Sequence, residues 1–222
     1  MINTKTLVIL LGTARGGEET WNTMYKNLIE PYSADLALLF GKNSDKSSSL
    51  YKKAKFIWEI NEYSDWWDYF KKYFSNRLYD IFKKNEIEGL GGGINNFRGS
   101  GAIIFAFRHF LKNNFKNELI KYDRIILTRS DFYYIDCHPL LKNDLFYIVE
   151  GERYGGLTDR HHIFPTSMID DVLGINDFLD DKNNYKYLLS KNLNPERALY
   201  EFYKHNKLIK KIKYCKRVQF IV

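Results

Sequence analysis

Cysteine is scarce in this sequence, which contains only Cys137 and Cys215. These two residues lie far apart and do not have the spacing of metal ligands. Sparing use of cysteine is typical of a reducing compartment. We therefore expect a cytoplasmic location.

Long apolar runs are also missing. No stretch approaches the roughly 20 apolar residues that a membrane-spanning helix needs, so we expect no membrane span. The apolar run nearest the beginning of the chain, Leu7 to Leu11, is too short for the core of a signal peptide. Proline-rich linkers and internal repeats are absent too, and the 222 residues therefore predict a single domain.

Acidic residues are outnumbered, with 27 Asp and Glu against 34 Lys and Arg and a formal net charge of +7. A positive balance can indicate a protein that binds nucleic acid. Here, however, the basic residues are scattered among acidic ones, and only short clusters occur, such as Lys210 to Lys213. We therefore expect an electropositive site for an anion such as a sugar diphosphate, and we do not expect nucleic acid as a partner.

Apolar and aromatic residues are plentiful, at 45% and 17%, and can form a sizeable core. Their periodicity predicts strands at 6–11, 35–40, 55–60, 124–128, 145–149 and 218–222. It predicts helices at 18–29, 65–84, 102–111, 167–173, 177–190 and 195–205. Pro31 is expected to end the first helix, and Ser64 and Asn194 are expected to cap the second and the last. Strands and helices alternate in the first half, which favours an α/β fold with a mostly parallel sheet and helices on both faces.

The strand at Arg124 to Thr128 ends in the tripeptide Arg129-Ser130-Asp131. In open α/β sheets, ligands bind beyond the carboxyl ends of the strands. A carboxylate in that place can hold a metal ion that is bound to a phosphate. The alternative is that Asp131 only begins a turn after a core strand.

Two glycine-rich segments are further candidates for a phosphate site. In Gly12 to Gly17, the glycines let the backbone approach phosphates and Arg15 can neutralise them. This segment matches neither common glycine-rich phosphate motif, so a plain turn between strand and helix is the alternative. In Gly91 to Gly101, Arg98 precedes a predicted helix whose N-terminus could bind a diphosphate. There the alternative is a flexible loop.

A third segment, Gly151 to His162, is rich in side chains that can transfer protons. Asp159 lies beside Arg160, which favours the ionised carboxylate that a general base requires. The neighbouring His161 and His162 would point to opposite sides of an extended segment. We therefore do not expect both histidines to bind one metal ion.

The strand followed by Arg-Ser-Asp, and the later segment Gly-Gly-Leu-Thr-Asp-Arg-His at 155–161, resemble small GT-A glycosyltransferases. The nearest pattern is that of the short glycosyltransferase domains encoded by large algal DNA viruses, and related motifs occur in bacterial capsule and lipopolysaccharide transferases. The resemblance runs from the Gly12 loop through the helix that follows Asn194. It implies the GT-A fold, a nucleotide-sugar donor such as a UDP-sugar, a glycan or glycoprotein acceptor, and Mn²⁺ or Mg²⁺ on the diphosphate. For a viral protein, it implies the host cytoplasm.

The resemblance also implies roles for residues. Residues 1–131 would form the nucleotide-sugar half and 132–222 the acceptor half. Asp131 matches the last carboxylate of the D-x-D motif and would bind the metal, whereas Arg129 stands where the first Asp is expected. Asp159 would be the catalytic base, and a single base opposite the leaving group would invert the sugar carbon. The residues expected to bind substrate are Gly12, Thr13, Arg15, Arg98, Ser130, Arg160 and His161.

Two other functions fit parts of the pattern. A sugar-phosphate nucleotidyltransferase uses a similar sheet, but the lysine of its usual glycine-rich signature is missing from Gly12 to Gly17. A degenerate module that binds glycan or nucleic acid without catalysis would explain Arg129 in place of a carboxylate. The intact pair Asp159-Arg160 argues against such degeneration.

Overall fold

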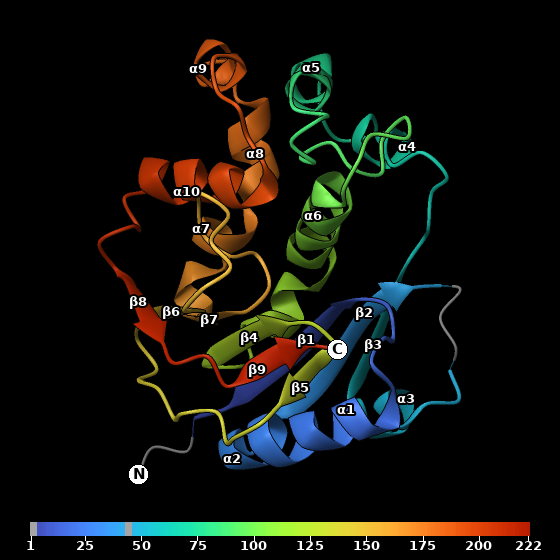
Figure 1. Ribbon diagram of the computed structural model, residues 1–222, viewed down its shortest axis with the longest axis vertical. Coiled ribbons are helices and arrows are strands. Elements are labelled where there is room, and N and C mark those ends of the chain that lie inside the picture. Colours follow the sequence, from blue (N-terminus) through green and yellow to red (C-terminus); the bar gives the residue numbers. More distant parts are fainter. Residues whose placement is uncertain (1–3, 43–45) are drawn as a thin grey trace.

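A seven-stranded sheet forms the centre of the protein, with helices on both faces (Figure 1). The structure is a computed structural model that describes residues 4–42 and 46–222. The strands are β1 Thr6–Gly12, β2 Asp35–Gly41, β3 Phe56–Ile60, β4 Arg124–Thr128, β6 Phe146–Val149, β7 His162–Pro165 and β8 Ile212–Cys215. The predicted α/β class, the mostly parallel sheet and the single domain are confirmed.

The strand order across the sheet is β3-β2-β1-β4-β7-β6-β8. The first four strands in this order are parallel to one another, β7 is antiparallel to both of its neighbours, and β6 and β8 are parallel. Because β1 and β4 are adjacent and parallel, with Leu10 opposite Thr128, their carboxyl ends lie side by side. The segments that follow these two strands are therefore neighbours in space.

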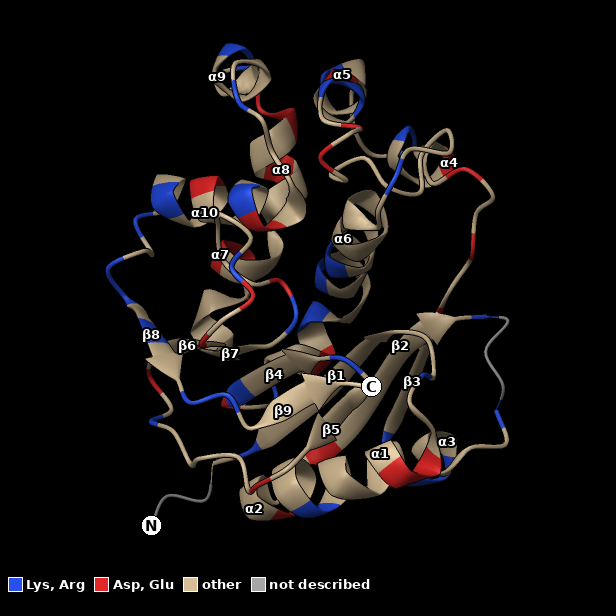
Figure 2. Ribbon diagram, in the orientation of Figure 1, with Lys and Arg blue, Asp and Glu red and all other residues tan. Residues whose placement is uncertain are grey.

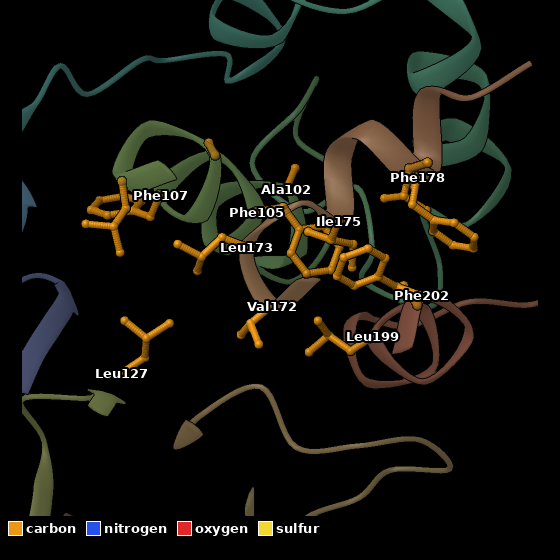
Figure 3. Packing of buried hydrophobic residues seen from close by; sticks show 14 of the residues in the cluster. Ala102, Phe105, Phe107, Leu127, Val172, Leu173, Ile175, Phe178, Leu199 and Phe202 are labelled. Atoms are coloured by element: carbon orange, nitrogen blue, oxygen red, sulfur yellow. The ribbon is translucent and has the colours of Figure 1, made fainter. Parts of the chain in front are cut away.

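The sheet separates two hydrophobic cores. Successive side chains of a strand point to opposite faces, so Leu7 and Ile9 of β1 enter one core and Val8 and Leu10 enter the other. Helices α1 (Gly17–Met24) and α3 (Ser49–Lys53) cover the smaller core. In the larger core, side chains from β4 meet those of α6 (Gly101–Leu119), α7 (Ile169–Leu173), α8 (Ile175–Asp180) and α10 (Pro195–His205), as Figure 3 shows. The sequences of β1, β2 and β4 are almost continuously apolar because both faces of these strands are buried.

The first helix continues past Pro31, so the prediction that this proline ends it is wrong. Helix α1 leads into a π turn at Tyr25–Ile29 and then into α2, Glu30–Tyr32. Pro31 lies in the first turn after the wider π turn, where a missing N–H group is tolerated. The helix ends at Ser33, whose backbone is left-handed with φ of 47°.

The second predicted helix is divided into α4 (Trp67–Phe70) and α5 (Asn76–Lys84). Ser75, rather than Ser64, is an N-cap: its side chain accepts a hydrogen bond from the backbone N–H of Arg77. The same hydroxyl donates to Asp180 of α8, a residue 105 positions along the chain. A tertiary contact therefore fixes this break, and helical periodicity alone does not reveal it.

The other predicted elements differ from the structure mainly in their length, whereas α3, β5 (Phe132–Tyr134), β7 and β8 were not predicted. Helix α6 extends over Gly101–Leu119, and the helix expected at 177–190 is divided into α8 (Ile175–Asp180) and α9 (Tyr185–Leu189). A short 3-10 turn at Thr166–Met168 leads into α7, Ile169–Leu173, and β5 (Phe132–Tyr134) pairs with β9 (Gln219–Ile221) in a second small sheet. Helix α10, Pro195–His205, has the predicted cap, because Asn194 accepts a hydrogen bond from the N–H of Arg197 at 2.8 Å. In the described part of the chain, no helix has the length and apolar character to cross a membrane.

Candidate functional site

The loop after β1 is hydrogen-bonded to the segment that follows β4. The backbone N–H of Arg15 donates to Ser130 Oγ at 3.0 Å, and that hydroxyl donates to the carbonyl oxygen of Thr13 at 2.6 Å. Trp21 of α1 supports the junction, since its Nε1 donates to the carbonyl oxygens of Arg15 and Ser130 at 2.7 and 3.1 Å. The structure thus brings together Thr13, Arg15 and Ser130, three of the residues predicted to bind substrate.

The glycines of this loop allow its close approach to β4. Gly12 and Gly16 have φ values of 115° and 92°, which favour glycine. A Cβ atom on Gly16 would lie 3.1 Å from Cα of Asp131 and 2.9 Å from a methyl carbon of Thr20. Close contact with the end of β4 therefore explains the glycine at position 16, and the positive φ explains the glycine at position 12.

Asp131 and Arg129 form a bidentate ion pair at the end of β4. Arg129 Nε and Nη2 donate to the two carboxylate oxygens of Asp131 at 2.7 and 2.6 Å. Burial by itself raises the pKa of Asp131, but the hydrogen bonds and charge of Arg129 outweigh it and lower that pKa overall. The pair lies in the turn between β4 and β5, so Asp131 is also the turn residue of the alternative interpretation.

The metal ion implied by the resemblance does not fit this arrangement. Both oxygens of Asp131 are already engaged by Arg129. Across residues 4–42 and 46–222, no three His, Cys, Asp or Glu side chains come together in a group that could hold a metal ion. We therefore derive no chemical step through Mn²⁺ or Mg²⁺ at Asp131.

A second cluster of charges lies in the loop between β6 and β7, where Figure 2 shows both signs of charge. Glu152 accepts from Arg160 at 2.8 Å and from Arg217 at 2.7 Å. The carboxylate of Asp159 is 3.9 Å from Arg160 Nε, and its side chain is only 7% exposed. The pKa of Arg129 is raised mainly by the hydrogen bonds that it donates to Asp131, and the charges of Asp159 and Glu152 contribute further. The two charged clusters are therefore neighbours.

A buried arginine holds the backbone of the predicted base. Arg108 of α6 is 1% exposed, and its Nη2 donates to the carbonyl oxygen of Asp159 at 3.1 Å. Its other partners are the neutral groups of Val172, Tyr203 and His162. A buried cation costs stability unless it is hydrogen-bonded. The bond that Arg108 donates to the carbonyl oxygen of Asp159 meets part of this need and holds the loop in position.

Glu196 is a candidate that sequence reasoning missed. It lies in the first turn of α10, is 8% exposed, and has a pKa raised to about 7, first by burial and then by the charge of Asp159. The β6–β7 loop docks against it: the N–H of Leu157 donates to the carbonyl oxygen of Glu196 at 3.0 Å. A Cβ atom on Gly156 would lie 2.1 Å from the same oxygen, so glycine is required there. No sequence signal places Glu196 beside Asp159, because their proximity comes from this docking.

The two histidines point to opposite faces of the sheet, as predicted. His161 is fully buried, bonds to Thr128 Oγ1 at 2.9 Å and stacks on His138 with ring centroids 5.2 Å apart. His162 contacts the other side, at 3.1 Å from Arg108 Nη2. His161 is therefore enclosed by other side chains, and direct contact with a substrate would need a change in this packing.

Arg98 is not brought to the Gly12 loop. It is exposed in the loop before α6, which lies beside α4 and α5 in Figure 1, and Trp66 donates to the carbonyl of Gly93 within it. The glycine density has a packing explanation, because a Cβ atom on Gly92 would lie 2.1 Å from the carbonyl carbon of Gly99. The predicted phosphate contact of Arg98 stays a prediction that this geometry does not support.

A hollow of about 550 Å³ lies elsewhere on the surface, between α1 and β5. Its lining includes Asn22 of α1, Lys26 of the π turn that follows α1, and Tyr133 of β5. None of the predicted site residues lines it, so the charged clusters, rather than this hollow, are the candidate site.

The structure thus joins the Gly12 loop, the Arg129–Asp131 pair and the carboxylates Asp159 and Glu196 in one region at the ends of β1 and β4. Such a region offers hydrogen-bond donors and arginines to an anion, and carboxylates to a proton. We compared the sequence with models of protein families and found no match, and a comparison with curated proteins gave no match either. The resemblance to GT-A glycosyltransferases therefore stays a prediction from short motifs.

Proposed function

We propose that this protein is a glycosyltransferase that moves a sugar from a nucleoside-diphosphate sugar, in the first instance a UDP-sugar, to a hydroxyl group of a glycan or glycoprotein. The observation that carries the proposal is the junction between the Gly12–Gly17 loop and the Arg129–Asp131 segment. Ser130 Oγ links the two by accepting from Arg15 and donating to Thr13. Ligands of α/β sheets bind at such strand ends.

The donor binds, in this proposal, where the loop meets the end of β4. The diphosphate needs hydrogen-bond donors and positive charge, and Arg15 and the backbone N–H groups of the loop supply both. Departure of the nucleoside diphosphate leaves negative charge on its terminal phosphate. Positive groups fixed in place before the reaction stabilise that charge at little cost in reorganisation.

Asp159 accepts the proton of the acceptor hydroxyl. The oxygen then attacks the anomeric carbon, the bond from that carbon to the diphosphate breaks, and the configuration inverts. The backbone of Asp159 is fixed by Arg108, and Arg160 lies beside its carboxylate. Glu196, with a pKa of about 7, is present in both protonation states near neutral pH and can exchange a proton with the same cluster.

The finer fold class and the division of the chain belong to the same proposal. We assign the sheet to the GT-A type, with residues 1–131 binding the nucleotide sugar. Residues 132–222 supply Glu152, Asp159, Arg160 and Glu196 and would bind the acceptor. The algal-virus resemblance makes the cytoplasm of a host cell the expected location.

Thermal unfolding tests the donor site. UDP at millimolar concentration should raise the melting temperature, since a ligand present at 100 times its Kd stabilises the folded state by about 2.7 kcal/mol. The buffer should contain Mn²⁺, so that the result holds with or without a metal requirement. Uridine, which lacks phosphates, is the control and should give little shift. Absence of a shift with every nucleoside diphosphate would reject the donor site.

A further inference from the structure

The guanidinium of Arg129 is held in place by Asp131, but not all of its N–H groups have an acceptor among the described residues. Its Nε and Nη2 bind the two oxygens of Asp131, which fixes the plane of the group. Among residues 4–42 and 46–222, no acceptor is bonded to Nη1. The Arg129 side chain is 30% exposed, whereas that of Asp131 is 8% exposed. A fixed cation with free N–H groups therefore faces outward at the end of β4.

This cation lies against the loop that the proposed function assigns to phosphates. Ser130, the residue between Arg129 and Asp131, bonds to the loop at Thr13 and Arg15. The charge of Arg15 also contributes, after burial and Arg129, to the pKa of Asp131, so Arg15 shares this electrostatic environment. Two arginines therefore face one region, and Asp131 is the only carboxylate in the described part of the chain that is bonded directly to either of them.

A divalent cation would have to compete with Arg129 for Asp131. Binding of the ion would break two charge-assisted hydrogen bonds and would place two positive charges beside a guanidinium. A planar guanidinium can itself bind phosphate oxygens through paired N–H groups. The geometry thus favours the arginine over a metal ion as the cation of this site.

We propose that Arg129 replaces the divalent cation, so that the protein binds the diphosphate of its nucleotide donor without metal. Arg129 donates from Nη1 to the phosphate oxygens, Asp131 holds the guanidinium in place, and Arg15 adds the second positive charge. The inference rests on the proposed nucleotide-sugar site. It adds a binding residue to that site and removes a cofactor from it.

Isothermal titration of the full chain with UDP tests this inference. The Kd in EDTA should agree within about threefold with the Kd in Mn²⁺. Arg129→Met should weaken binding in EDTA by at least tenfold, because it keeps the side chain's bulk but loses its charge and donors. Arg77→Met is the matched control: this half-exposed arginine of α5 should leave affinity unchanged. Arg129→Lys keeps the positive charge but lacks the paired N–H groups of the guanidinium. It replaces Arg129→Met in this test if Arg129→Met does not fold.

The outcomes separate the two proposals. If UDP binds in Mn²⁺ but not in EDTA, the inference is wrong and the donor site survives. Unchanged affinity in both Arg129→Met and Arg129→Lys would also overturn it, because the guanidinium would then not touch the phosphates. If no nucleoside diphosphate binds in either buffer, the proposed function fails together with the inference.

Discussion

Asp159→Asn should lower the rate of sugar transfer by about 10²–10⁴-fold, the usual contribution of general acid–base catalysis. The amide has nearly the same shape as the carboxylate but cannot take a proton from the acceptor. Donor binding should stay close to that of the wild type, since the bond from Arg108 goes to the backbone carbonyl of residue 159. Steady-state kcat, with the Kd for UDP measured separately, checks both parts.

The matched control for this variant is Asp144→Asn, which changes an exposed carboxylate in the loop before β6. It should leave both turnover and donor affinity unchanged. If Asp159 only caps a turn or pairs with Arg160, asparagine will serve nearly as well and kcat will stay within a few-fold of wild type. That result would remove Asp159 from the mechanism and make Glu196 the next candidate base.

Glu196→Gln should change how stability depends on pH. The pKa of Glu196 is raised from 4.5 to about 7, first by burial and then by the charge of Asp159. Folding therefore disfavours its ionised form, so the stability it contributes is complete below pH 4.5 and is lost as pH rises through about 7. Since one pKa unit corresponds to 1.36 kcal/mol, the loss is on the order of 3 kcal/mol. The glutamine cannot ionise and avoids this loss.

Urea denaturation of both proteins between pH 4.5 and 8 measures the effect. The buried histidines, whose pKa values are lowered mainly by burial, give the opposite trend, because they lose stability as pH falls. Both proteins carry these histidines, so the difference between their free energies of unfolding isolates Glu196. A difference that does not vary with pH would show that Glu196 ionises as readily in the folded protein as in the unfolded chain.

The parallel half of the sheet could be predicted from the sequence because its strands are buried on both faces. Such strands are continuous apolar runs, and β1, β2 and β4 have this form. Strand β7 was missed because His162 opens it and Pro165 ends it, which hides its apolar centre. Its histidine is buried through a hydrogen bond from Arg108, a long-range partner.

The candidate site could be predicted only in part, for a similar reason. Adjacent parallel strands end together, so the meeting of the Gly12 loop with Asp131 follows from strand order. The bond between Arg129 and Asp131 depends on side-chain conformation, and the sequence motif did not reveal it. Glu196 reaches Asp159 only because α10 docks on the β6–β7 loop through Gly156. Contacts between segments that are far apart in the sequence were therefore the ones that could not be predicted.

Hydrolysis of nucleotide sugars is the measurement that tests the central claim most directly. The protein should be incubated with a panel of UDP-, GDP- and other nucleotide sugars, and release of the nucleoside diphosphate followed with time. The account predicts release from at least one donor, with the rate sharply reduced in Asp159→Asn. Binding without turnover of any donor or acceptor would indicate a non-catalytic module. Release of pyrophosphate from a nucleoside triphosphate and a sugar phosphate, with no donor hydrolysed, would contradict the account in favour of a nucleotidyltransferase.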